Sequence, residues 1–494
     1  MFRQLLRLSQ HSIIYGFGVV VSQVVGFFLI PVYTRYLTPI DYGTLELLQV
    51  TASMLGVIFV MGLNSALFRS YFLYDDAENK KKVVSTVFLF LSASSVLLTL
   101  LLVALGGRFS SLLFGSPEYT LYFRLIFLGL FLDTGIMVGL SVFMVRQEPV
   151  NYALVSVTRA VMGIGLNIFF VVVLHKGVLG ILEGTVITSA FVYFMLLGSV
   201  IRRTGFRFSF EELKRMLAFG LPLIPGGLAF YILTLSDRYL LQFLSTTTEL
   251  GLYSLGYKFG LVVGVLLVGP FSTAWGPFAF IAAKEPNARQ TFSRVLTYFV
   301  LVAIFIALAL SVLSKEVLYV MATPAFFNSY KVVPFIALSY VLYGCYYILA
   351  VGLSLEAKTM YIAAVVGAVA ILNVGLNYLL IPPYGMMGAA SATLIAFLVL
   401  VIASFLASQR FYKIGYDWGR VAKIFLAASM VYAGSLFITN ESGIIEGVFK
   451  LLSLLAYPIL LYLLRFYQPE ELQKVREIIK GLPSYIKMKR SPRP

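Results

Sequence analysis

Residues 235–260 read LSDRYLLQFLSTTTELGLYSLGYKFG and lie between two long apolar runs. Asp237 and Arg238 stand side by side in this stretch, where a hydrocarbon environment would disfavour either charge. The DRYL motif at 237–240 also matches a TRYL motif at 34–37. A charge pair near hydrocarbon, in a segment that occurs twice, indicates a duplicated membrane protein with a polar interior.

The composition is that of an integral membrane protein. Of the 494 residues, 60% are hydrophobic and only 12% are charged, and the mean hydropathy is +0.91. A soluble globular protein of this size would not tolerate so much apolar surface. We therefore predict an all-α membrane protein.

Apolar runs long enough to cross about 30 Å of hydrocarbon predict about fourteen transmembrane helices. They lie at 12–31, 45–68, 83–105, 121–145, 150–174, 178–201, 218–243, 251–275, 291–313, 332–354, 360–381, 386–408, 421–439 and 445–465. The first run lacks a small-residue cleavage site, so we expect a retained helix and not a signal peptide. Twelve helices, with a late pair merged or absent, would also leave both ends of the chain on one side of the membrane.

A second internal match supports the duplication. Residues 166–190 and 372–396 both begin with Leu-Asn and carry two glycines three residues apart, at nearly the offset of the RYL motifs. Spans one to six and seven to twelve are therefore predicted to be two copies in the same orientation. The predicted units are an N-lobe at 1–203, a cytoplasmic amphipathic linker at 204–217, a C-lobe at 218–408, two further spans at 409–465 and a basic amphipathic cytoplasmic tail at 466–494.

Two polar residues predict helix starts next to these units. Ser209 is followed three residues later by Glu212, a capping-box pattern that predicts a short amphipathic helix before span seven. Asp417 is expected to cap a similar short helix before span thirteen.

The net charge of +16 comes mainly from Lys and Arg in alternate loops and in the tail. Because cytoplasmic loops keep positive charge, both ends of the chain are predicted to be cytoplasmic. We expect these cations to bind anionic lipids and not nucleic acid. A single cysteine, Cys345, and two histidines, His11 and His175, exclude a disulfide framework and argue against a Cys/His metal site.

Ionisable and amide side chains inside the predicted spans are the candidate binding residues, because such groups face a bundle interior or a cavity. The candidate cations are Arg159, Arg35, Arg69, Arg124, Arg238 and Lys258. The candidate cavity amides are Gln23, Asn64, Asn167, Asn373 and Asn377, and the candidate ion-coupling acids are Glu46, Asp133 and Asp237. Several of them could instead pair structurally or reach the membrane interface, and Arg159 is the cation farthest from a span end. The excess of cations favours an anionic cargo.

Proline and glycine in span seven predict mobility. The sequence LPLIPGG carries Pro222, Pro225, Gly226 and Gly227, which remove backbone hydrogen bonds or permit bending. The segment is either a fixed kink or a hinge used in transport.

Four stretches carry a family resemblance. They are SQVVGFFLIPVYTRYLTPIDYGTLELLQV at 22–50, FGLPLIPGGLAFYILTLSDRYLL at 219–241, ELGLYSLGYKFG at 249–260 and IPPYGMMGAASATLIA at 381–396. Over nearly its whole length the chain resembles bacterial O-antigen-type polysaccharide flippases of the multidrug/oligosaccharidyl-lipid/polysaccharide (MOP) exporter superfamily.

The resemblance implies two six-helix lobes in a V-shaped arrangement like that of multidrug MATE transporters, plus two extra C-terminal helices. It implies transport of a polyprenyl-diphosphate-linked oligosaccharide from the inner to the outer leaflet of the bacterial cytoplasmic membrane. It further implies a monomer, with polysaccharide-assembly proteins as candidate partners. Related lipid II flippases read Ser-Arg-x-x-Gly-Phe in their first span, whereas here Gln23 replaces the arginine.

Alternative functions stay open. A drug antiporter of the same superfamily would need an acidic, aromatic cavity for cations, and a lipid II flippase would need the missing arginine. A membrane enzyme such as a glycan polymerase would need a large external loop or an acid–base constellation, and neither is present in the sequence. No phosphate-binding loop occurs, so we expect no cofactor and no ATP hydrolysis. Transport then follows an H⁺ or Na⁺ gradient or the membrane potential.

Overall fold

The computed structural model of the chain describes residues 26–438, 443–469, 471 and 473. Its described part contains helices and no strands, as predicted. Gln23, most of the first predicted span and the greater part of the predicted tail helix lie outside the described residues.

The first half of the described chain forms the N-lobe. Its helices are α2 Ile30–Tyr36, α3 Pro39–Val60, α4 Leu63–Tyr71, α5 Ala77–Phe114, α6 Thr120–Val145, α7 Pro149–Ile168 with a π-helical extension Phe169–Val173, and α8 Gly177–Thr204.

The second half forms the C-lobe and two further spans. Its helices are α9 Phe210–Gly220, α10 Ile224–Leu244, α11 Thr247–Gly260, α12 Gly269–Ala282, α13 Ala288–Met321, α14 Val333–Leu349, α15 Val351–Leu355, α16 Thr359–Phe411, α17 Trp418–Ser435, α18 Gly443–Ser453 and α19 Ala456–Leu463. The π-helical turn Gly264–Val268 joins α11 to α12, and the 3₁₀ helix Pro324–Val332 precedes α14.

Eleven helical segments of the described chain are long and apolar enough to cross a membrane. One of them, α16, contains two predicted spans, because Gly385 has non-helical dihedral angles (φ 54°, ψ −130°) and reverses the chain there. The thirteenth predicted span corresponds to α17, and the first lies mainly outside the described residues. The architecture therefore fits fourteen membrane helices.

The start signals near the linker are only partly as predicted. Ser209 does cap α9 by accepting a hydrogen bond from the Glu212 amide, but the Glu212 carboxylate accepts a hydrogen bond from Tyr74 and pairs with Arg215. The prediction for Asp417 was wrong in one respect: it caps α17, the span itself, and no separate short helix precedes that span.

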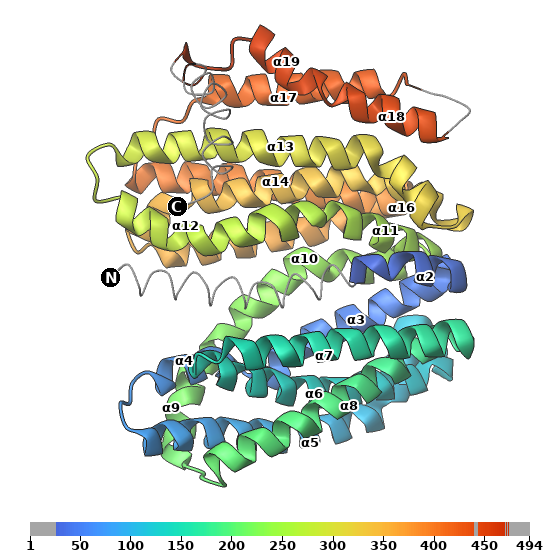
Figure 1. Ribbon diagram of the computed structural model, residues 1–494, viewed down its shortest axis with the longest axis vertical. Coiled ribbons are helices and arrows are strands. Elements are labelled where there is room, and N and C mark those ends of the chain that lie inside the picture. Colours follow the sequence, from blue (N-terminus) through green and yellow to red (C-terminus); the bar gives the residue numbers. More distant parts are fainter. Residues whose placement is uncertain (1–25, 439–442, 470, 472, 474–494) are drawn as a thin grey trace, which may run out of the picture.

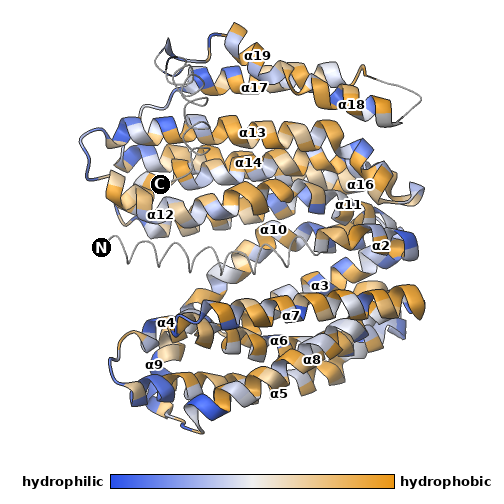
Figure 2. Cartoon of the chain, viewed as in Figure 1, coloured by the Kyte–Doolittle hydropathy of each residue, from blue (hydrophilic) through white to orange (hydrophobic). Residues whose placement is uncertain are grey.

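Figure 1 shows the helices in two groups, with α3–α8 in one and α10–α16 in the other. The groups lie closest together at the end where α2, α3 and α11 meet, and farther apart at the end that carries α4, α9 and α12. Helices α17–α19 pack outside α13. Figure 2 shows hydrophobic residues along the helices and hydrophilic residues gathered at the helix ends and loops.

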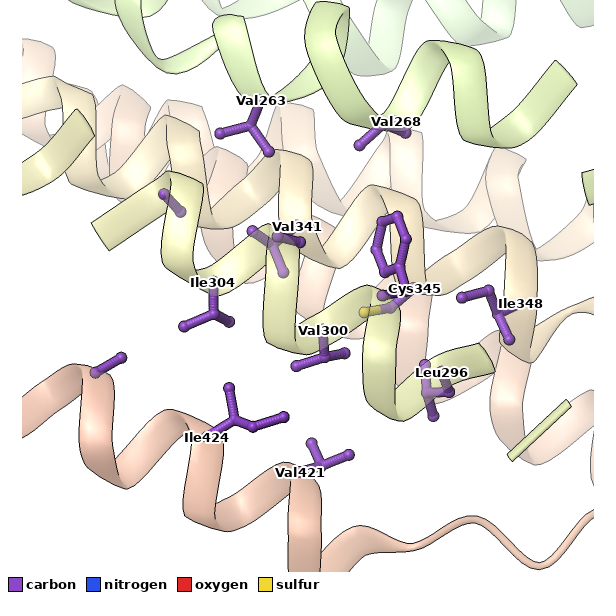
Figure 3. Close-up of a cluster of buried hydrophobic side chains, with 14 of the residues drawn as sticks. Val263, Val268, Leu296, Val300, Ile304, Val341, Cys345, Ile348, Val421 and Ile424 are labelled. Carbon is purple, nitrogen blue, oxygen red and sulfur yellow. The ribbon is translucent and has the colours of Figure 1, made fainter. Parts of the chain in front are cut away.

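The C-lobe core also holds the additional helices in place. Figure 3 shows Val300 and Ile304 of α13 packed between Val341 of α14 and Ile424 of α17. Cys345 lies buried in this cluster. Burial of aliphatic side chains from three helices fixes α17 against the C-lobe.

Two glycine pairs bring the first half of the chain against the second. A side chain on Gly251 would overlap the backbone of Pro39 and Gly43, so α3 and α11 cross in backbone contact. Near the opposite end, Gly62 meets Gly220 in the same way, but this contact joins α9 to α4 on the N-lobe side and does not join the two lobes. Only residues without a side chain permit such close approach.

Candidate functional site

A cavity of about 550 Å³ lies between the N-lobe and C-lobe, lined from one side by residues of and before α2 and α3 and from the other by α11 and the π-turn. Most of its lining is apolar. The polar side chains that reach it are Tyr33, Tyr42, Gln49 and Lys258. The part of its lining that the structure describes is therefore largely apolar with one cation, Lys258.

Lys258 is positioned by groups of the opposite lobe. Its Nζ donates a hydrogen bond to the Tyr42 hydroxyl at 3.0 Å, lies 4.7 Å from the centre of that ring, and lies 3.5 Å from Oε2 of Glu46. Its side chain keeps 34% of its surface exposed, whereas Glu46 keeps 11%. Lys258 can thus contact a ligand in the cavity while its ion pair with the more buried Glu46 keeps the side chain in position.

Glu46 contacts a second cation of the C-lobe, Arg238. Oε1 of Glu46 lies 3.8 Å from Nε of Arg238, whose side chain is only 2% exposed. Arg238 also pairs with Asp237 at 2.7 Å and lies over the Tyr257 ring at 3.8 Å. Glu46 is therefore the N-lobe member of a buried charge cluster whose other members come from α10 and α11.

The negative charge of Asp237 is balanced by an ion pair and by hydroxyl groups of neighbouring helices. Besides Arg238, the Tyr253 hydroxyl donates a hydrogen bond to it, and the Thr393 hydroxyl lies 3.5 Å from its Oδ2. A carboxylate that is 3% exposed needs such partners, because an unpaired charge there would be strongly destabilising. The Asp237–Arg238 pair is therefore tolerated because four side chains from three other helices surround it: Glu46, Tyr253, Tyr257 and Thr393.

Two amides of α16 are also buried in the C-lobe. Asn377 donates a hydrogen bond to the Asn373 side chain at 3.1 Å and to its carbonyl at 2.9 Å. Among the described residues the amide nitrogen of Asn373 and the amide oxygen of Asn377 have no partner. No group of three or more His, Cys, Asp or Glu that could hold a metal was found within the described ranges.

The N-lobe contains a separate charge pair. Arg159 of α7 lies 2.7 Å from Asp133 of α6, and the Ser189 hydroxyl of α8 donates to the same carboxylate oxygen at 2.8 Å. Both charged side chains stay about two-fifths exposed. The structure thus brings these two candidates together, at a place other than the 550 Å³ cavity.

The other candidate cations lie elsewhere. Arg35 and Arg124 are exposed on α2 and α6, and Arg69 lies 4.6 Å above the Phe219 ring near the α9 end. Asn64 accepts a hydrogen bond from Ser141 at 2.6 Å, and Asn167 is buried against Gly184. Their roles as cargo-binding residues stay predictions.

The proline-rich segment marks a break between two helices. Pro222 lies in a 3₁₀ turn, Leu221–Leu223, between α9 and α10, and Pro225 stands in the first turn of α10. Gly226 has open space around it, whereas Gly227 faces Val57 of α3. The break lies beside the Gly62–Gly220 contact, and its use as a hinge stays a prediction.

Sequence reasoning missed the tyrosines of the site. Tyr42, Tyr253 and Tyr257 each contact a charged side chain. Tyr253 and Tyr257 are four residues apart in ELGLYSLGYKFG, so they lie on one face of the helix, the face that meets Arg238. This spacing was the sequence signal that could have predicted their role.

Residues 8–280 match the sequence profile of the family described as polysaccharide biosynthesis protein, which is more than half of the chain. The chain belongs to this family.

Other comparisons agree with this membership of the polysaccharide biosynthesis protein family. Protein 1 of the Lsg locus of Haemophilus influenzae is 25% identical over 321 residues, which cover 63% of this chain and 76% of that protein. The lipid II flippase MurJ, in an inward closed conformation, superposes with a TM-score of 0.75 at 17% identity, covering 91% of this chain and 98% of MurJ. An inward-facing multidrug resistance MATE transporter of the MOP superfamily superposes with a TM-score of 0.61 at 16% identity, covering 78% of this chain and 94% of that one.

These similarities confirm the resemblance predicted from the sequence. The chain is a multi-pass membrane protein with the fold that MurJ and MATE transporters share. At these low identities the two solved structures support the fold and not a particular cargo.

Proposed function

We propose that this protein is a flippase that moves a polyprenyl-diphosphate-linked oligosaccharide from the inner to the outer leaflet by alternating access. The observation that supports it most is Lys258, a partly exposed cation in the wall of a largely apolar cavity between the lobes. A diphosphate leaving water needs such a positive charge, and the apolar lining suits a lipid chain.

The charge cluster connects cargo binding to the contact between the lobes. Lys258 and Arg238 belong to the C-lobe, and Glu46 belongs to the N-lobe. A diphosphate in the cavity would compete with Glu46 for Lys258 and so weaken an ion pair that joins the two lobes. The binding energy of the diphosphate would thereby favour a conformation in which the ion pair between Glu46 and Lys258 is weakened or broken.

The ion that drives transport, if one does, would act at an acid that can change its partners. Asp133 is the most exposed of the three candidate acids, whereas Asp237 is enclosed by its partners. We propose Asp133, Glu46 and Asp237 as candidates for coupling to H⁺ or Na⁺. We propose further that both termini are cytoplasmic, that the protein acts without catalysing a reaction, and that it works in the bacterial cytoplasmic membrane.

A reconstituted flipping assay tests the role of Lys258. Proteoliposomes would carry a polyprenyl-diphosphate oligosaccharide, and its appearance in the opposite leaflet would be measured with a membrane-impermeant sugar-modifying enzyme. Loss of a charge-assisted hydrogen bond costs about 1.5–3 kcal/mol, so we expect Lys258→Gln to slow flipping by about 10- to 150-fold. Lys258→Arg should keep part of the activity.

The matched control is Lys284→Gln, which removes an exposed lysine from the loop after α12. It should flip the lipid at the wild-type rate. If Lys258→Gln also flips it at that rate, the cavity cation does not bind the diphosphate and the proposed mechanism is wrong. If Lys258→Gln slows a MATE-type organic cation and not the lipid, the antiporter alternative replaces it.

A further inference from the structure

A second, smaller pocket lies where α4, α5, α6 and α8 all end at the same face of the N-lobe. Its volume is about 80 Å³. Tyr71 ends α4, Ala77 begins α5, Arg146 follows α6 and Thr204 ends α8, so four helix termini converge on it. It is remote in the fold from the cavity of Lys258, because it lies at the end opposite to α2.

Three cations line this pocket: Lys80, Lys81 and Arg146. Lys80 lies 5.4 Å from the centre of the Tyr71 ring, and this ring holds the ammonium group at the pocket. Lys81 has one ion pair, with the exposed Glu78 at 3.5 Å. Within the described ranges no carboxylate lies within 4.0 Å of the Lys80 or Arg146 charge.

The acidic residue nearest to Arg146 in sequence is Glu148, which pairs with other residues. Both carboxylate oxygens of Glu148 accept hydrogen bonds from Arg203, at 2.8 and 2.7 Å, and Asn151 donates to one of them at 2.7 Å. Burial opposes the ionisation of Glu148, but these hydrogen bonds prevail and lower its pKa. Glu148 is thus held as a carboxylate mainly by Arg203, and it interacts with Arg146 only through a weaker Coulomb attraction, without a direct ion pair.

Two of the three acids at the start of α5, Asp76 and Glu78, are similarly engaged, whereas Asp75 lies exposed just before the helix. Asp76 caps the helix by accepting hydrogen bonds from the Asn79 backbone and side chain at 2.7 and 2.9 Å. Glu78 is shared between Lys81 and Arg207. The cations of the pocket therefore outnumber the carboxylates that are free to neutralise them.

The pocket has the size and polarity for one tetrahedral oxyanion. Its volume is that of about two or three waters in the liquid. The first turn of the 38-residue α5 adds backbone N–H groups and the positive end of the helix dipole beside the cations. Val84 closes the apolar side of the pocket.

We propose that this pocket binds a phosphate group, either the headgroup phosphate of an anionic phospholipid or a free phosphate ion. Basic pockets between helix ends on the cytoplasmic side are where anionic headgroups bind. A bound phosphate would join the ends of four N-lobe helices and stabilise the start of the linker, whose Gly205 carbonyl accepts a hydrogen bond from Ser85 of α5 at 2.9 Å. The proposal does not depend on the cargo of the central cavity.

Binding can be measured on the purified full-length protein by native mass spectrometry and by thermal shift. The probes are phosphatidylglycerol, diacylglycerol with the same acyl chains, and inorganic phosphate. Removing one surface cation weakens anionic-lipid binding by about fivefold. We expect this loss for phosphatidylglycerol in both Lys80→Gln and Arg146→Gln, and no specific binding of diacylglycerol.

Two further variants separate the pocket from general surface charge. Lys82→Gln removes an exposed cation two positions after Lys80 and outside the pocket lining, and it should bind like the wild type. Ala77→Leu fills the pocket without changing any charge, and it should lose binding. Because Ala77 is exposed in the first helical turn, this variant tests the site even if a charge variant does not fold.

The two sources of phosphate give different results. Stabilisation by phosphatidylglycerol alone identifies a lipid site, whereas stabilisation by inorganic phosphate as well identifies a small-anion site. Equal binding by Ala77→Leu, Arg146→Gln and the wild type would overturn the proposal, as would an equal loss in Lys82→Gln.

Discussion

The backbone contact between Gly43 and Gly251 makes a sharp prediction about the equilibrium between conformations. In Gly251→Ala the new methyl group would overlap the Pro39 carbonyl and the Gly43 amide. Both are backbone groups in α3, which cannot rotate away as a side chain could. The variant should therefore separate α3 from α11 at this end of the lobes.

The magnitude follows from two opposing effects. Gly→Ala in a helix interior is favourable by about 1 kcal/mol, because alanine has the higher helix propensity. Overpacking at a close contact costs about 1–3 kcal/mol. Here it raises the free energy only of the conformation in which α3 and α11 touch. That conformation should lose about 5- to 150-fold in population relative to one in which the lobes part.

Double electron–electron resonance would measure this shift. Spin labels at Ile40 of α3 and Phe243 of α10 report the separation of the lobes, since both side chains are about half exposed. Cys345→Ala removes the native thiol without placing a hydroxyl in the apolar cluster of Figure 3. We expect Gly251→Ala to replace the short distance by a longer one.

The control is Gly375→Ala in α16, where a new Cβ would meet nothing within 4 Å. It should leave the distance distribution unchanged and raise stability slightly. Gly43→Ala, which brings a methyl group against Thr247 and Gly251, should behave like Gly251→Ala. An unchanged distribution in both contact variants, with folded protein, would refute the idea that this crossing holds the lobes together.

Three other predictions concern separate parts of the chain. Glu148→Gln should lower stability by about 1 kcal/mol at pH 7. Because the pKa of Glu148 is lowered below 4.5, its contribution is present above that pH and disappears as the pH falls through the folded-state pKa, so thermal unfolding curves of variant and wild type should converge in acid. Arg159→Ala should abolish flipping in proteoliposomes while insertion persists, and Arg159→Lys should keep part of it; wild-type transport by the alanine variant would exclude Arg159 from the transport site. Cysteines at 40 and 246, crosslinked across the lobes, should stop flipping until the crosslink is reduced, whereas full crosslinking with normal flipping would mean that these ends do not move apart.

Local physical chemistry made the helices predictable from the sequence. Hydropathy over about twenty residues determines which segments span a bilayer, and that information is contained in each segment itself. The cap of α9 at Ser209 was predictable for the same reason, because capping depends on residues a few positions apart. The side chain of Glu212 was not, since its partner Tyr74 is distant in sequence.

Similar motifs in the sequence did not reveal the different surroundings of their residues. TRYL and DRYL look equivalent in the sequence, yet Arg35 is exposed at the end of α2 whereas Arg238 is 2% exposed. The difference arises because Arg238 meets Glu46 from the other lobe, and no local pattern specifies that meeting. Likewise, Asp133 and Arg159 were separate candidates until the packing of α6 against α7 paired them.

The sequence by itself therefore determined an all-helical membrane protein with cationic loops, because hydropathy and charge are properties of the chain alone. Only the tertiary structure decided which charges share a site. Coulombic pairing and pocket shape depend on distances of a few ångströms between helices that are far apart in sequence. For this reason Lys258 with Glu46, and Lys80 with Arg146, come together as candidate sites only when the helices are packed together.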